Sequence, residues 1–182
     1  MRIIRFAALA ETPWKNGGGT TTEIAVSPPG AGFEDFDWRL SVARVASEGP
    51  FSRFPGIDRT LTLIEGAGMR LAIEGREEAT LSTDSAPLPF LGDVLAEAWL
   101  VNGPIRDLNV MTRRGRWAHE VLRLDGEAEV SADCPTIVVA LGEAALDAET
   151  LGFGDTAWME AGEQKSFRGK GLLVKFTSAT AA

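Results

Sequence analysis

Short apolar or β-branched runs, each closed by glycine, proline or aspartate, recur along the chain and constrain its fold most strongly. Residues 20–27 are rich in β-branched side chains and stop at two prolines and a glycine, which cannot continue a strand ladder. Residues 37–45 alternate, with Trp38, Leu40 and Val42 on one face. Short strands separated by turn residues are typical of β-sandwiches and barrels. The sequence therefore predicts an all-β fold.

Further strands are expected along the rest of the chain, and one segment is ambiguous. Residues 58–65 and 69–74 flank a Gly-Ala-Gly turn and are predicted to pair as a hairpin. Residues 142–151 contain good helix formers, but helical and alternating patterns both fit them. The remaining predicted strands cover residues 107–113, 136–141 and 171–177.

The two halves of the chain share a weak order of features. In each half an apolar strand meets a glycine, a Gly-Asp pair follows, and a further apolar strand ends the series. The Gly-Asp pairs are residues 92–93 and 154–155. Glycine turns in any β protein can produce this order by chance, whereas a true repeat predicts two related barrel units.

Charge and cysteine content bear on partners and compartment. The formal net charge is −8, which disfavours nucleic-acid binding because that depends on clustered Lys and Arg. The single cysteine, Cys134, permits no internal disulfide and is expected to be a buried, inert thiol in a reducing compartment. Arg5 interrupts the short apolar run near the start, so no signal peptide is expected, and no apolar stretch has the length of a membrane span. We expect a cytoplasmic protein without nucleic-acid or membrane partners.

The chain contains one histidine, His119, and this limits the metal chemistry open to it. Zinc and non-haem iron sites use several imidazole or thiolate ligands, and one His with one Cys cannot supply them. No Gly-X-Ser-X-Gly elbow accompanies the histidine either. We therefore predict no metal, no other cofactor and no catalytic residue, and expect His119 to be a surface or interface side chain.

A glycine-rich loop is the first candidate ligand site. Trp14, Lys15 and Asn16 precede three consecutive glycines, a pattern that indicates positive φ or a closely approached backbone. The pattern disfavours a phosphate loop, because the lysine precedes the glycines and a strand follows them. Two readings remain: a flexible turn into the first strand, or a loop whose amides, Lys15 and Asn16 bind an anion.

Arginines are the second candidates, since a guanidinium suits bidentate recognition of a carboxylate. Arg39 lies on the strand face opposite Trp38, so a solvated outer face and a ligand contact are both open. Arg59 shares a face with the apolar positions of its strand and needs an acidic partner or a ligand. Asp58 or Glu65 would serve as that structural partner. Arg113 ends another predicted strand, where a barrel mouth would lie.

Residues 49–56 form a turn-rich loop with two aromatics and a hydroxyl, and either plug a barrel end or cover a ligand pocket. Ser52 and Asn109 would supply neutral hydrogen bonds there, and Trp14 and Phe54 an apolar wall.

These motifs together resemble the HutD/Ves family. The resemblance rests on the segments PWKNGGGT (residues 13–20), FDWRLSVA (residues 36–43), GPFSRFPGIDR (residues 49–59) and LNVMTRRG (residues 108–115), in that order. It implies a metal-free bicupin, a single unit over residues 1–182 with two double-stranded β-helix (cupin-type) barrels, approximately residues 1–115 and 116–182. The positions that match the family pattern are Trp14, Lys15, Asn16, Arg39, Ser52, Arg59, Asn109 and Arg113.

The resemblance also implies a role in bacterial histidine utilisation, in which the protein binds urocanate or N-formylglutamate and restrains the pathway without catalysing a step. Our hypothesis is a carboxylate-binding sensor, as a monomer or homodimer, in which Arg59 and either Arg39 or Lys15 bind the carboxylate. One alternative is a metal-independent isomerase or hydrolase of a small acid or sugar, with Glu23, Asp58 or Glu65 as general base. A second alternative is a regulator whose arginines bind a protein partner.

Overall fold

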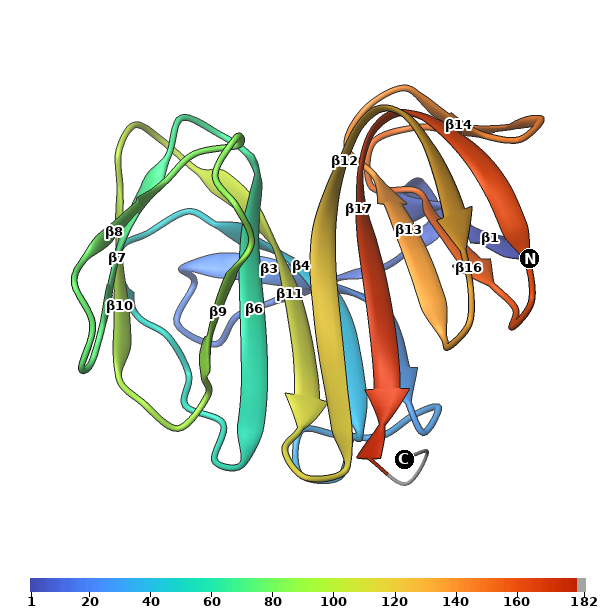
Figure 1. Ribbon diagram of the computed structural model, residues 1–182. Coiled ribbons are helices and arrows are strands. Elements are labelled where there is room, and N and C mark those ends of the chain that lie inside the picture. Colours follow the sequence, from blue (N-terminus) through green and yellow to red (C-terminus); the bar gives the residue numbers. More distant parts are fainter. Residues whose placement is uncertain (180–182) are drawn as a thin grey trace. The chain divides into compact units, whose positions relative to one another are not determined.

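The computed structural model describes residues 1–179, in which strands make up nearly all of the regular structure (Figure 1). The helical element that lies wholly within this range is the 3-10 turn η1 (Phe6–Ala8), and no helix of these residues could span a membrane. The chain separates into two compact units. One is Ala10–Arg116, and the other combines Met1–Leu9 with the chain from Trp117 onward. The all-β prediction is confirmed.

The unit Ala10–Arg116 is built from two antiparallel sheets. The larger sheet has the order β2-β3-β4-β11-β6-β9, and the smaller has the order β5-β10-β7-β8. The strands are β2 (Glu11–Pro13), β3 (Gly19–Ser27), β4 (Trp38–Val45), β5 (Gly49–Pro50), β6 (Ile57–Glu65), β7 (Met69–Ile73), β8 (Ala79–Leu81), β9 (Leu88–Leu91), β10 (Ala96–Leu100) and β11 (Ile105–Arg113).

An apolar core lies between these two sheets. Leu61 and Leu63 of β6 pack in one cluster with Met69 and Leu71 of β7 and Ala98 of β10, and each is at most 1% exposed. Alternation along β6 sends these leucines to the same face as Arg59, as the sequence predicts. The inner face of the larger sheet is therefore apolar toward one end of β6 and carries a cation at the other.

The second unit is a single seven-stranded sheet. Its order is β1-β16-β13-β17-β14-β15, and β12 also pairs with β17. Phe167 and Val138 are fully buried in its core. The strands are β1 (Arg2–Ile4), β12 (Trp117–Ser131), β13 (Thr136–Ala140), β14 (Ala144–Leu146), β15 (Glu149–Leu151), β16 (Thr156–Met159) and β17 (Gln164–Ser178).

The predicted hairpin of residues 58–65 and 69–74 is wrong. β6 pairs with β9 and β11, whereas β7 pairs with β8 and β10 in the other sheet. Gly66 and Gly68 both have positive φ, and this turn carries the chain from one sheet to the other. Alternation marks the inward face of each strand but does not identify its hydrogen-bonded neighbour, so the pattern suits both arrangements.

Two other segments go beyond what local pattern indicates. Residues 142–151 are not helical but form the pair β14 and β15, joined by a turn in which Asp147 has φ 52°. The sequence pattern does not predict β12, because its side chains are mostly exposed or half-buried and Gly126 interrupts its alternation. That glycine lies opposite Gly169 of β17, in a ladder that continues along all of β12.

Candidate functional site

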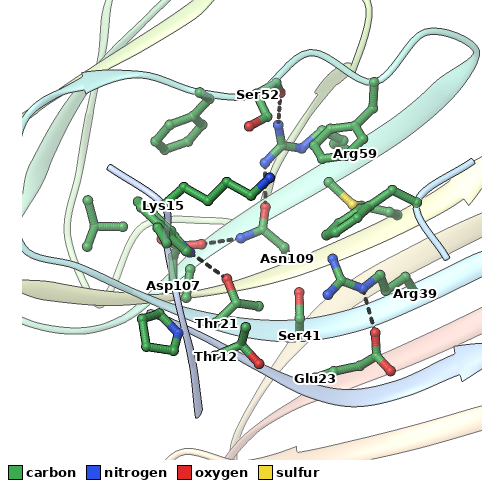
Figure 2. Close-up of a pocket in the computed structure, with 18 of the residues that line it drawn as sticks. Thr12, Lys15, Thr21, Glu23, Arg39, Ser41, Ser52, Arg59, Asp107 and Asn109 are labelled. Atoms are coloured by element: carbon green, nitrogen blue, oxygen red, sulfur yellow. Dashed lines mark hydrogen bonds and ion pairs between the residues drawn. The ribbon is translucent and has the colours of Figure 1, made fainter. Parts of the chain in front are cut away.

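A cavity of about 790 Å³ lies within the unit Ala10–Arg116 (Figure 2). Its floor is the inner face of β3, β4, β6 and β11, and its walls come from residues 10–16 and 50–54 and from Phe33. This volume falls in the range that encloses small ligands.

Strand register arranges the polar side chains of the floor in rows. Met111 of β11 lies opposite Arg39 of β4 and Arg59 of β6, so these three positions form one row across three strands. Adjacent strands are about 4.8 Å apart, which separates the two arginine Cα atoms by about 10 Å. Two residues along β11, Asn109 opposes Ser41 in the next row. The polar residues thus project from consecutive rows into one cavity.

Arg59 is buried at this floor, with 6% of its surface exposed. One terminal nitrogen donates to Asn109 Oδ1 at 2.7 Å, and the other to the Ser52 carbonyl at 3.2 Å. The guanidinium carbon lies 5.0–5.6 Å from the ring centroids of Phe51, Phe54 and Phe90. Burial lowers the pKa of Arg59 to about 10, against the attraction of Asp107. The group stays a cation at neutral pH in an aromatic cage.

Asp107 lies one row beyond Asn109 on the same face of β11 and is 1% exposed. Its Oδ1 accepts a short hydrogen bond from the Asn109 amide nitrogen. Within residues 1–179, neither Asp107 Oδ2 nor Arg59 Nε has a hydrogen-bond partner. Burial raises the pKa of Asp107 to about 7, although Arg59 and the Asn109 hydrogen bond act to lower it.

Arg39 lies at the other end of the same row and faces the cavity, not a solvated outer surface. Its side chain is 12% exposed, and Nε donates to Glu23 Oε2 at 2.8 Å (Figure 2). The guanidinium carbon lies 4.4 Å from the ring centroid of Phe33. Phe33 in turn packs against Phe54, with 5.7 Å between centroids. Aromatic side chains therefore adjoin both arginines.

The glycine-rich loop supplies the third cation. Lys15 is an exposed lining residue, and Figure 2 shows its side chain extending across the cavity toward Arg59. Trp14 Nε1 donates to Thr21 Oγ1 at 2.8 Å, which ties the loop to β3. Asn16 Oδ1 accepts a hydrogen bond from the Gly18 backbone N–H, with 3.0 Å between nitrogen and oxygen, and so stabilises the turn itself. The loop is a defined turn that presents Lys15 to the cavity.

The glycines of this loop are required for two different reasons. Gly17 has φ 72° with open space around it, whereas a Cβ at Gly19 would lie 2.2 Å from the Arg44 carbonyl oxygen. Gly17→Ala is expected to lower the free energy of unfolding by about 1 kcal/mol, the cost of the left-handed conformation. Urea unfolding would measure this. Gly142→Ala, at a glycine with open space and no positive φ, is the control; equal stability of both variants would contradict the prediction.

Eight of the nine predicted ligand residues line this cavity, and Arg113 does not. Arg113 donates to the carbonyls of Glu34 and Phe36, both at 2.9 Å, and holds that loop instead. Arg113 is the last residue of β11, and this position along the strand does not determine the direction of its long side chain. The eight are Trp14, Lys15, Asn16, Arg39, Ser52, Phe54, Arg59 and Asn109.

The predicted acidic partners of Arg59, Asp58 and Glu65, each pair with a different arginine. Asp58 pairs with Arg114 at 2.8 Å, and Glu65 pairs with Arg106. Neither carboxylate lines the cavity: Asp58 alternates onto the face of β6 opposite Arg59, and Glu65 is the exposed last residue of the strand. Asp107, which sequence reasoning missed, is the acid near Arg59. Its position two residues before Asn109 on an alternating strand was the available signal.

The described part of the chain contains no cluster of three or more His, Cys, Asp or Glu side chains placed to hold a metal ion. His119 is half-buried on β12, in the unit that does not contain the cavity. Cys134 is half-buried rather than fully buried, with Sγ 3.9 Å from Thr136 Oγ1.

The described strands form an all-β, cupin-like fold. A cupin 2 conserved barrel domain protein from Leptotrichia buccalis superposes with a TM-score of 0.60 over 97% of this chain and 96% of that one, at 11% identity. The HutD family model matches residues 7–174. The chain belongs to the HutD family.

Relatives of known sequence and structure agree with this assignment. HutD from Pseudomonas fluorescens SBW25, solved in a formate condition, shares 35% identity and a TM-score of 0.88, covering 97% of this chain and 98% of that one. An uncharacterised 21.2 kDa protein of the hutC 3' region of Pseudomonas putida is 30% identical, over 90% of this chain and 89% of its own. Protein Ves of Citrobacter koseri is 43% identical over 57% of this chain and 53% of its own.

Proposed function

We propose that this protein is a non-catalytic binding protein for a small acid and modulates histidine utilisation, with urocanate or N-formylglutamate as the ligand. The observation that carries the proposal is Arg59, an almost fully buried cation on the floor of a ligand-sized cavity. Burying a guanidinium is costly unless an anion or hydrogen-bond acceptors compensate it. A ligand carboxylate completes that compensation.

The charge of the cavity supports an anionic ligand. Lys15, Arg39 and Arg59 line it against two carboxyl groups, Glu23 and Asp107, although the whole chain carries a net charge of −8. Among residues 1–179, Lys15 lines the cavity and forms no ion pair, whereas Arg39 is paired with Glu23. A cationic cavity in an acidic protein favours a carboxylate over a cationic ligand.

The walls favour an acid with an organic body. Phe33, Phe51 and Phe54 offer apolar surface beside the cations, and the space exceeds what a one-carbon acid fills. The related HutD from Pseudomonas fluorescens was solved in a formate condition, and formate is the simplest carboxylate. This combination supports a pathway acid of several carbons, held by its carboxylate at Arg59.

A metal-free bicupin is part of the proposal, with cupin halves of approximately residues 1–115 and 116–182, except that Met1–Leu9 belong to the second unit, where β1 pairs with β16. The two Gly-Asp turns support it, because Asp93 accepts a backbone N–H from Gly56 and Asp155 accepts one from Phe6. Each aspartate also pairs with an arginine, Arg114 for Asp93 and Arg5 for Asp155. We further propose a cytoplasmic monomer or homodimer without nucleic-acid or membrane partners.

Calorimetric titration with urocanate, N-formylglutamate, formate and glutamate tests the proposal. One pathway acid is expected to bind saturably, and NMR spectra of the same mixtures should show no chemical change in it. Arg39→Met is expected to weaken that binding by about tenfold, the effect of losing one charge-assisted hydrogen bond.

Arg70→Met is the matched control for Arg39. Arg70 also pairs with a glutamate, Glu78 at 3.3 Å, and lies over an aromatic ring, Trp99 at 5.5 Å, but it is not a lining residue. Its loss should leave affinity unchanged. No binding of any of the four acids would overturn the proposal, and turnover of one would favour the metal-independent enzyme, for which Glu23 is the predicted base that lines the cavity.

A further inference from the structure

The floor of the cavity contains a carboxyl group without an ion pair of its own. Asp107 is 1% exposed, and within residues 1–179 its Oδ2 has no hydrogen-bond partner. Its register neighbours on the flanking strands are Ala43 and Leu63, so its own row of the sheet is otherwise apolar. A buried carboxylate in such surroundings is held in its charged form only by nearby positive charge.

Arg59 is the cation of this hydrogen-bond network, and Asn109 links it to Asp107. The Asn109 amide donates to Asp107 through nitrogen and accepts from Arg59 through oxygen (Figure 2). Arg59 therefore has two possible counter-charges, the aspartate behind Asn109 and an anion in the cavity. An anion bound to Arg59 competes with Asp107 for the same cation.

We infer that the site binds its acid together with a proton, which Asp107 accepts as the acid engages Arg59; this inference rests on the proposed function. The electrostatic reason is that a carboxylate at Arg59 cancels the attraction that keeps Asp107 ionised. Neutral Asp107 also leaves the cavity with a larger positive charge for the acid. By linkage, protonation and acid binding then strengthen each other.

The other charged groups around the cavity do not replace Arg59 in this role. Lys15 comes from the loop after β2, Glu23 from β3 and Arg39 from β4, while the strands of the smaller sheet contribute no charged lining residue among those described. Arg39 is already paired with Glu23. Burial raises the pKa of Asp107 to about 7, and Arg59 is the charge that opposes this rise. Asp107 can therefore take up a proton at neutral pH.

The test is calorimetric titration at pH 7 in buffers of different ionisation enthalpy. N-formylglutamate is the probe, with formate as a second probe, because neither has a group that titrates near neutrality. The wild-type protein is expected to take up about half a proton per bound acid, since Asp107 is about half protonated beforehand at that pH. Affinity should also be several-fold higher at pH 6 than at pH 8.

Asp107→Asn keeps a side-chain oxygen that accepts the Asn109 hydrogen bond and removes the titrating carboxyl group. Proton uptake on binding should therefore fall to zero, and the affinity for the acid should lose its pH dependence. Asp84→Asn, at an exposed site outside the cavity, should leave the uptake unchanged. Binding with the same heat in every buffer and the same affinity at both pH values would overturn the inference and leave the proposed function standing. Absence of binding would overturn both. The wild-type measurements suffice if Asp107→Asn does not fold.

Discussion

Replacing Arg59 with methionine is expected to weaken N-formylglutamate binding by about 10- to 100-fold. A hydrogen bond to a charged group contributes about 1.5–3 kcal/mol, and about 1.4 kcal/mol corresponds to a factor of ten in affinity. The upper part of this range applies because Arg59 is 6% exposed and surrounded by three phenylalanine rings, where water screens its charge poorly. Calorimetric titration of the variant gives the fold-change directly.

The design of this variant separates loss of binding from loss of folding. Methionine fits an aromatic cage in length and polarity, and circular dichroism with thermal unfolding establishes that the variant is folded. Arg44→Met is the control, since Arg44 is an exposed arginine on β4 of the same sheet and does not line the cavity. A folded Arg59→Met protein that binds with wild-type affinity would remove Arg59 from the site.

Replacing Asp107 with asparagine is expected to change how stability depends on pH. The pKa of Asp107 is raised from 3.8 to about 7 in the folded protein, so folding favours its protonated form. This stabilisation is fully present below about pH 4 and is lost as the pH rises through about 7. A tenfold change in a proton-binding constant corresponds to about 1.4 kcal/mol, so ionisation costs the wild type up to about 4 kcal/mol. Asp107→Asn does not carry this cost.

Urea unfolding of both proteins between pH 5 and pH 8 measures this difference. The free energy of unfolding of Asp107→Asn should increase relative to wild type across that interval, with most of the change below pH 7. Asp84→Asn should follow the wild-type curve, because Asp84 is exposed in a turn. If the free energies of unfolding of wild type and Asp107→Asn changed in parallel with pH, the prediction would be contradicted. The folded protein would then stabilise the ionised carboxylate as well as water does.

Arg59 and Asp107 both lie on the inner face of their strands, but only Arg59 is recognisable as inward-facing from the sequence. Alternation assigns Arg59 to the inner face because it lies two and four residues before Leu61 and Leu63. Asp107 likewise lies two residues before Asn109, a predicted ligand residue. An aspartate at the start of a predicted strand, however, resembles an ordinary turn residue. Its burial follows from the sheet, since β11 is central and lies between β4 and β6.

Strand pairing is the part of the fold that local pattern does not reveal. The period of two marks which side of a strand is inward, and it holds for β6 and β7 alike. Which strands then exchange hydrogen bonds depends on backbone contacts between residues far apart in sequence. β6 and β7 therefore resemble a hairpin in sequence although they belong to opposite sheets.

Local sequence patterns are sufficient to predict the all-β class, the family and the inward direction of Arg59, and to mark the glycine-rich loop that carries Lys15. These follow from local alternation, from backbone conformations that only glycine adopts readily, and from motifs read in order. Three features appear only in the folded sheet: Arg39 faces the cavity, Arg113 does not, and Asp107 is the acid coupled to Arg59. These features depend on register, because the antiparallel pairing of β4, β11 and β6 sets which side chains share a row, and burial then sets their charge.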